Sequence, residues 1–251
     1  MKKLIGALIV MAWLPIVFMA GCSSSPTGPG SSTPTPTPGP TATPQAAQAA
    51  VNLNSAAGFV VLASTQITNS GPTTLCGDLG LSPGTQVTGA PAVACGGVYH
   101  VTDTTAANAK SDLTIAYNDA AGRTTPALVA GNLGGQTLYP GLYKCTSGLS
   151  VSSGDLTLDA QGNSNGVFIF QIASTLVLTS GRKVILAGGA KAANVFWQVG
   201  SYCSLGTTVS MKGTIMAHNQ VTLDTGALLE GRALSQIDEV TMLSNLINKP
   251  L

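Results

Sequence analysis

Residues 148–174, GLSVSSGDLTLDAQGNSNGVFIFQIAS, are followed directly by residues 175–201, TLVLTSGRKVILAGGAKAANVFWQVGS. The two blocks have equal length and align without a gap, which places Leu149 on Leu176 and Leu158 on Ile185. Each block contains a short strand pattern, a Ser-Gly turn, a second strand, a Gly-rich turn and an apolar strand. Self-similarity at such a period is typical of solenoids.

Shorter blocks follow, beginning near Cys203, Val221 and Val240, with Gly213 and Gly231 in matching places. A coil of three short strands cannot bury its apolar side alone, but stacked coils pair in parallel and enclose one long core. A β-sandwich also contains many short strands, but it does not repeat with its turn glycines in register. The pattern therefore favours a mainly β fold, a three-faced parallel solenoid, over a sandwich.

Residues 103–121 lack the alternation of apolar and polar residues that marks a strand. Apolar and long side chains recur there at helical spacing, at Ala106, Lys110, Leu113, Tyr117 and Ala120. Gly122 follows as a stop signal. We expect one long α-helix packed along the side of the solenoid.

The N-terminus has the order of features found in secretory signals: Lys2 and Lys3, an uncharged apolar run over residues 4–20, then Gly21 and Cys22. Small residues directly before a cysteine resemble the bacterial lipobox. We expect residues 1–21 to be a lipoprotein signal peptide and Cys22 to carry the lipid. A plain anchor or plain secretion is the alternative.

The residue after the cysteine is Ser23 rather than Asp, which favours export to the outer membrane or cell surface in a Gram-negative envelope. Residues 22–48 are rich in Ser, Thr and Pro, a composition typical of extended tethers without a core. The interpretation is a lipid-tethered domain over residues 49–251 that touches the membrane only through its N-terminal lipid.

Charged residues make up 8% of the chain, against about a quarter in a typical soluble protein. This composition contains no basic patch for nucleic acid and suits strands whose outer faces carry hydroxyl groups. Four cysteines remain besides Cys22, at positions Cys76, Cys95, Cys145 and Cys203. They allow two disulfides in any of three pairings. Buried free thiols are an equal alternative.

Several phrases together resemble the bacterial and fungal ice-binding proteins. In chain order they are VNL (51–53), GDLGLSPG (77–84), AYNDAAGR (116–123), GGQTL (134–138), PGLYK (140–144), VFIFQI (167–172), NVFWQV (194–199) and GRAL (231–234). The resemblance covers the whole mature domain. It implies a right-handed, discontinuous β-helix with a flanking α-helix, in which the first coil packs beside the last. It also implies ice binding without catalysis.

The ice-binding surface is predicted from the strand that begins each repeat, where polar residues flank one inward apolar residue. The predicted residues are Thr65, Thr68, Ser147, Ser150, Thr175, Ser201, Ser204, Asn219, Thr222 and Thr241. Stacked hydroxyls can hold water in a nearly fixed lattice, because each one donates and accepts. The expected partner is an ice surface, and we expect a monomer.

In the family that this sequence resembles, the pattern on these strands is similar to Thr, then Ala or Gly, then any residue, then Thr or Asn. This chain departs at the second position, where Gln66, Tyr202, Gln220 and Glu239 replace small residues. Such long side chains are expected to roughen the surface and hold their own water. An adhesion or carbohydrate-binding solenoid is therefore the alternative, with Tyr202 stacking on a sugar ring.

Catalysis is not expected from this sequence. His100 and His218 lack a cysteine or carboxylate at metal-ligand spacing, and both are expected in surface or turn positions. The adjacent acids Asp238 and Glu239 do not form the carboxylate pair that glycoside hydrolysis requires, since neighbouring strand residues point to opposite faces. The sequence predicts no metal site and no cofactor.

Overall fold

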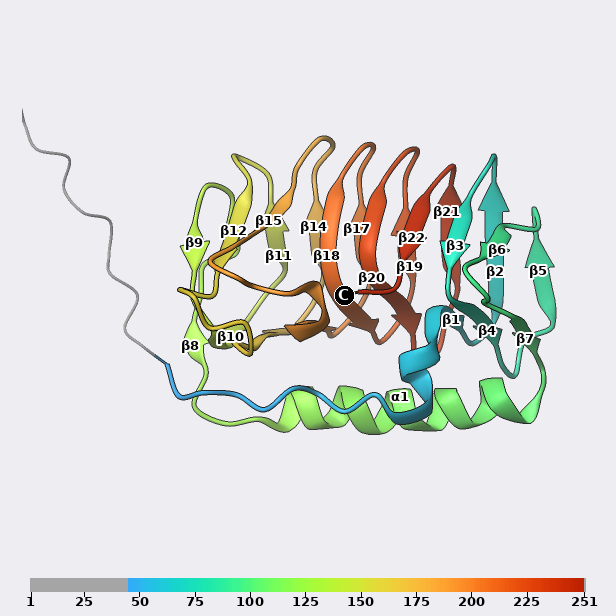
Figure 1. The fold of residues 1–251 in the computed structure, drawn as a ribbon, viewed down its shortest axis with the longest axis horizontal. Coiled ribbons are helices and arrows are strands. Elements are labelled where there is room, and N and C mark those ends of the chain that lie inside the picture. The colour runs from blue at the N-terminus through green and yellow to red at the C-terminus, as the bar shows by residue number, and fades with distance from the viewer. Residues whose placement is uncertain (1–44, 251) are drawn as a thin grey trace, which may run out of the picture. The chain divides into compact units, whose positions relative to one another are not determined.

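The computed structural model describes residues 45–250. The expected signal peptide, the lipidation site Cys22 and the tether up to residue 44 lie outside these residues. The described strands form parallel sheets that wind into a three-faced solenoid, with one long helix along its side (Figure 1). The expected mainly β solenoid with a flanking helix is therefore confirmed.

Three sheets carry the strands of the described segment. The twelve-stranded sheet contains β1 (Phe59–Ala63), β3 (Thr74–Cys76), β4 (Asp78–Leu81), β6 (Ala92–Ala94), β7 (Tyr99–Val101), β8 (Ala127–Leu128), β10 (Gly141–Cys145), β13 (Phe168–Ile172), β16 (Val195–Val199), β18 (Ser210–Ala217), β20 (Leu228–Ser235) and β22 (Leu246–Asn248). The seven-stranded sheet has the order β11 (Leu149–Val151), β14 (Leu176–Leu178), β17 (Cys203–Leu205), β19 (Val221–Leu223), β21 (Val240–Leu243), β2 (Gln66–Ser70) and β5 (Gln86–Thr88). The third sheet has the order β15 (Val184–Ala187), β12 (Leu156–Asp159) and β9 (Thr137–Leu138). Helical elements are η1 (Asn54–Gly58), α1 (Thr104–Gly122) and η2 (Ala192–Asn194).

The order of coils in the stack differs from their order in the chain. The last strand on the seven-stranded sheet, β21, pairs with β2 near the start of the chain, with Val240 opposite Ile67. In the same way β20 pairs with β1, and β22 pairs with β3. Helix α1 runs back along the solenoid and connects the two ends (Figure 1). The expectation that the first coil packs beside the last is confirmed.

The two long repeats are in register at their first and last strands but not in the middle. Leu149 lies opposite Leu176 and Phe168 opposite Val195, as the alignment predicts. Leu158, however, lies opposite Leu186 rather than Ile185. The gapless alignment is wrong here because the second repeat has one more residue before β15 and one fewer after it. Exposed turns absorb such changes, whereas the inward apolar residues keep strand register.

Two hydrophobic cores hold the fold together. Inside the solenoid, Tyr143, Phe170 and Trp197 stack on neighbouring strands, with ring centroids 5.3 and 4.1 Å apart. The second core lies between α1 and the outer side of the twelve-stranded sheet, and it includes Leu113 and Phe196. Residues 45–250 thus contain both cores, every sheet described above and the helix, which are the attributes of an independently folding domain.

Helix α1 confirms the predicted helix to within one residue at each end. Asp103 caps it, since its carboxylate accepts a hydrogen bond from the Ala106 backbone N–H at 2.8 Å. Gly122 is the last helical residue rather than the stop. The last carbonyls, including that of Ala120, accept hydrogen bonds from the Gln171 side-chain amide, so a glycine cap is not needed.

The strands β18 and β20 are eight residues long because each continues around a corner of the solenoid. Gly213 makes this turn with φ +103°, a conformation that side chains disfavour. A Cβ there would lie 2.6 Å from the carbonyl oxygen of Val195, and one on Gly231 would lie 1.9 Å from that of Gly213. The glycine repeat therefore marks the close approach of neighbouring coils.

Of the three cysteine pairings left open, the structure shows only one bond among the described residues. Cys76 and Cys95 form a disulfide with their Cα atoms 4.9 Å apart, which joins β3 to the turn after β6. Cys145 and Cys203 are buried free thiols inside the solenoid. Disulfide bonding, one of the two expectations, therefore holds for Cys76 and Cys95, and the other, buried free thiols, holds for Cys145 and Cys203.

Candidate functional site

The outward side of the seven-stranded sheet is called the hydroxyl face below. Its central row consists of one outward residue from each strand, paired in register across the whole sheet. In the order of the strands these residues are Ser150, Val177, Ser204, Thr222, Thr241, Thr68 and Thr88. Hydroxyl groups thus occupy six of the seven positions, and Val177 is the exception.

The residues before and after this row point into the solenoid. Leu149, Leu176, Cys203, Val221 and Val240 form the inward row on one side and are buried. The alternation of buried and partly exposed residues is what turns every hydroxyl of the central row outward. Burial raises the pKa of the Cys203 thiol, so this cysteine serves as a small apolar side chain of the core.

The structure divides the ten predicted residues into three groups. Five of them lie in the central row: Thr68, Ser150, Ser204, Thr222 and Thr241. Thr175 precedes β14, next to the first inward residue. The other four, Thr65, Ser147, Ser201 and Asn219, lie in the bends that lead into the strands.

These bends are also stacked. The backbone N–H of Ser201 donates to the Ser174 carbonyl at 2.9 Å, and that of Asn219 donates to the Ser201 carbonyl at 2.9 Å. The bend residues therefore form the margin of the hydroxyl face, and the central row forms its middle.

Thr88 was not among the predicted residues, nor was any other residue of strand β5, which extends the face at one edge. Thr88 lies opposite Thr68, and Gln86 lies opposite Gln66. The signal was present in the sequence, since TQVT at residues 85–88 repeats TQIT at residues 65–68. This short coil stands apart from the repeats from which the other residues of the face were predicted.

A second outward row runs beside the central one. On each strand it consists of the residue that comes directly before the inward residue preceding the central row. Its members are Gly148, Thr175, Tyr202, Gln220, Glu239, Gln66 and Gln86. The row begins with small residues at β11 and β14 and continues with long ones. Tyr202 is 46% exposed.

Three of the long side chains in this row are bonded to one another. The Gln220 amide donates to one Glu239 carboxylate oxygen at 2.7 Å, and the Gln66 amide donates to the other. Gln220 also lies 3.4 Å from the Thr241 hydroxyl. Three of the side chains that were expected to roughen the surface, those of Gln66, Glu239 and Gln220, therefore hold each other in place.

The hydroxyls of the central row differ in their own bonds. The Ser150 hydroxyl donates to the Gly131 carbonyl at 3.0 Å, and that of Thr88 contacts the Ile67 carbonyl at 3.5 Å. Among residues 45–250, the structure gives the hydroxyls of Ser204, Thr222 and Thr68 no protein partner. These three can therefore direct all of their hydrogen bonds to water.

The other two sides of the solenoid differ from the hydroxyl face. Helix α1 covers one of them. The remaining side exposes Leu228 and Leu246 and carries an ion pair between Lys212 and Glu230 at 2.7 Å. The uncovered row of hydroxyls is thus confined to one side.

The two histidines lie apart and serve local contacts. His100 contacts the Asp103 carboxylate at 2.7 Å, a carboxylate partner that was not predicted from the sequence. His218 contacts the Gln236 side chain at 2.9 Å. Within the described part of the chain, no three His, Cys, Asp or Glu residues come together as metal ligands would.

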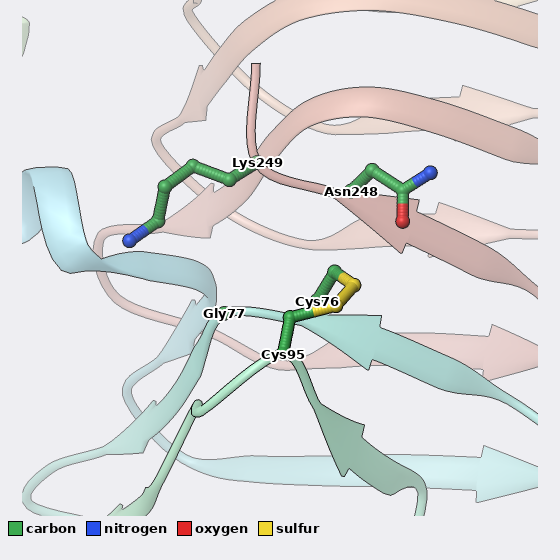
Figure 2. A pocket seen from close by; sticks show the side chains of 5 residues that line it. All are labelled: Cys76, Gly77, Cys95, Asn248 and Lys249. Carbon is green, nitrogen blue, oxygen red and sulfur yellow. A yellow bond between two sulfur atoms is a disulfide. The ribbon is translucent and has the colours of Figure 1, made fainter. Parts of the chain in front are cut away.

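A hollow beside the disulfide is lined by Cys76, Gly77, Cys95, Asn248 and Lys249. Figure 2 shows the side chains of Asn248 and Lys249 pointing in different directions above the sulfur atoms. A binding pocket has polar groups that converge on a ligand, and this hollow lacks that arrangement. None of the helices formed by residues 45–250 has the length and apolar character needed to cross a membrane.

Fold and site together define a three-faced β-solenoid that carries an in-register hydroxyl row on one sheet. The model of the "Ice-binding-like" family matches residues 61–248, and the chain belongs to this family.

Similar proteins come from bacteria and fungi. An "Ice-binding protein" of Nostoc sp. (strain HG1) is 40% identical over 78% of this chain and 73% of its own length. One from Colwellia sp. is 38% identical over 80% of this chain and 84% of its own. The crystal structure of an ice-binding protein from an Antarctic biological consortium superposes with a TM-score of 0.80, at 50% identity, and covers 84% of this chain and 97% of that one.

Proposed function

We propose that this protein binds ice through the hydroxyl face. The observation that carries the proposal is the run of five hydroxyl residues on neighbouring strands, Ser204, Thr222, Thr241, Thr68 and Thr88. Strands in a sheet lie about 4.8 Å apart, so these hydroxyls form a regular row. Water bridging such a row is ordered at little cost and can join the surface of a crystal.

Rigidity supports the same proposal. A surface that binds through many weak contacts retains affinity only if few degrees of freedom are lost on binding. Here the inward residues on both sides of the row, such as Val221 and Leu223, are fully buried, and every strand is bonded to its neighbours. Relatives named ice-binding proteins share most of this chain's length, which is consistent with the proposal. It requires no catalysis and no cofactor.

The test measures thermal hysteresis and inhibition of ice recrystallisation with residues 45–251. This segment includes Gln45, whose side chain accepts a hydrogen bond from the Leu142 backbone N–H at 2.9 Å. Ice shaping and slower recrystallisation are expected at micromolar protein. A protein that is folded by circular dichroism and inactive in both assays at high micromolar concentration would refute ice binding.

The surface itself is tested by Thr222→Tyr, which places a large ring in the middle of the hydroxyl row. We expect most of the activity to disappear while the melting temperature stays the same, because the side chain points away from the core. Thr157→Tyr is the matched control, since Thr157 lies on β12 of a different sheet. Equal activity in both variants would mean that another surface contacts ice.

We further propose that the protein is exported and anchored in the cell envelope through a lipid on Cys22, at the outer membrane or the cell surface. The support is the sequence order of Lys2 and Lys3, the apolar run, and Ala20-Gly21 before the cysteine. Cys22→Ala should release the protein from the membrane fraction and change its mobility on gels. Unchanged fractionation and mobility would contradict lipidation.

A further inference from the structure

The hydroxyl face contains a seam, which is the line along which the first coil of the chain pairs with the last. Strand β21 belongs to the last coil and β2 to the first, yet they are neighbours in the sheet, with Thr241 opposite Thr68. The run of five hydroxyls crosses this seam. Its regular spacing therefore depends on contacts between residues that are far apart in the chain.

Side chains on the face bridge the seam. Gln66 and Glu239 are bonded across it at a sequence separation of 173 residues. Glu239 is also bonded to Gln220, on the strand before it. Both carboxylate oxygens of Glu239 thus accept one amide N–H each, and three consecutive strands are joined in a line. Each of the three residues is only partly exposed.

This line of side chains, Gln220–Glu239–Gln66, is called the amide rail below. It runs parallel to the central row and lies beside Thr222, Thr241 and Thr68. Carbonyl oxygens of the two amides are left to accept hydrogen bonds from water. Long side chains usually lose rotational freedom when a surface binds, but bonded side chains have already lost much of it.

We infer that the amide rail is part of the ice-contacting surface, and that Glu239 is the positioning residue that holds it across the seam. The inference rests on the proposed function. On this inference the long side chains contribute contacts to ice, although they stand at positions where the family pattern has Ala or Gly. If instead they only obstruct the surface, shortening them should improve ice binding, so the two views predict opposite signs.

The experiment compares recrystallisation inhibition by residues 45–251 carrying Glu239→Ala, Gln220→Ala or Glu239→Gln with the unchanged segment. We expect the Glu239→Ala protein to be needed at roughly tenfold higher concentration for the same inhibition. Without Glu239, the side chains of Gln66 and Gln220 lose their common partner and would have to be ordered on binding. Gln220→Ala should cause a smaller loss. Glu239→Gln should retain activity within about twofold, since an amide can accept from one neighbour and donate to the other.

Glu230→Ala is the matched control, because Glu230 is also a partly exposed glutamate bonded to a neighbouring strand, on a different side of the solenoid. It should leave the inhibition unchanged. The melting temperature of each variant separates loss of fold from loss of contact. If Glu239→Ala is unstable, Gln220→Ala decides, because it leaves the Gln66–Glu239 bond across the seam intact.

Equal or higher activity of a folded Glu239→Ala or Gln220→Ala protein would overturn the inference and leave ice binding itself in place. An inactive unchanged segment would overturn both the proposed function and this inference. Loss in the two alanine variants, with activity retained in Glu239→Gln and Glu230→Ala, would support the rail.

Discussion

Lys110 shows how a single charged residue connects the helix to the hydroxyl face. Its ammonium group lies between α1 and the solenoid and donates hydrogen bonds to the backbone carbonyls of Ser235 and Gln236. Ser235 is the last residue of β20, and Gln236 begins the bend that leads to β21. Burial lowers the pKa of Lys110 to about 8. Lys110 thus holds the start of the bend before β21 in place, and the cost is the partial loss of water around its charge.

The lowered pKa predicts a pH dependence of stability. An unfolded lysine titrates near pH 10.4, so between about pH 8 and pH 10 the unfolded chain binds more protons than the folded one. Stability from this group should therefore rise as pH increases through that window. Lys110→Met should remove this rise in urea unfolding measured from pH 7 to 10.5, whereas Lys183→Met, at an exposed position, should not. A rise that persists in Lys110→Met would assign it to other groups.

Helix α1 is the element that ties the stacked coils together. It packs against η1 and against several strands of the twelve-stranded sheet, from β4 and β7 to β13 and β16. Its apolar side is made of small residues and Leu113, which lets the helix approach the sheet closely. Helices rarely persist alone, so the packed side supplies most of the stability of α1.

Two leucine-sized residues on opposite sides of α1 test this role. Leu113 is fully buried in the second core, whereas Ile115 is 60% exposed. Leu113→Ala should lower the free energy of unfolding by about 2–5 kcal/mol, and Ile115→Ala should change it by less than about 0.5 kcal/mol. Chemical denaturation with both proteins provides the comparison. Similar effects of the two substitutions would show that the helix is not held by its buried side.

At the scale of the whole molecule, the stack of coils is held together by contact between the first coil and the last. The N-terminal coils cover β20, β21 and β22, which are the last strands of the C-terminal stack. Uncovered parallel strands present unpaired backbone groups to other chains. The first coils therefore extend the hydroxyl face and also close the edge of the C-terminal stack.

Deleting residues 45–102 tests this role of the N-terminal coils. The remaining chain should self-associate through the uncovered strands and melt less cooperatively than residues 45–251. Size-exclusion chromatography and thermal unfolding followed by circular dichroism measure both effects. A monomeric fragment with an unchanged melting temperature would show that the C-terminal stack is complete without them.

Local pattern was sufficient to predict much of this structure. The repeats, the helix near residues 103–121 and the outward position of Thr68, Ser150 and Thr222 follow from periodicity, because alternation along a strand determines which side each residue faces. Four predicted residues, such as Ser147, lie in bends instead, since the sequence does not show where each bend ends and each strand begins. Thr88 is predictable from the sequence as well, because TQVT at residues 85–88 repeats TQIT at residues 65–68.

By itself the sequence determined the solenoid, its inward and outward rows and the hydroxyl character of one face, because these depend on residues close together in the chain. The tertiary structure alone decided the register of β12 with β15, the pairing of Cys76 with Cys95 and the bonds of Glu239 to Gln66 and Gln220. These features depend on which coils stack against each other and on how turns absorb extra residues. Two residues 173 positions apart become neighbours only when the first coil closes against the last.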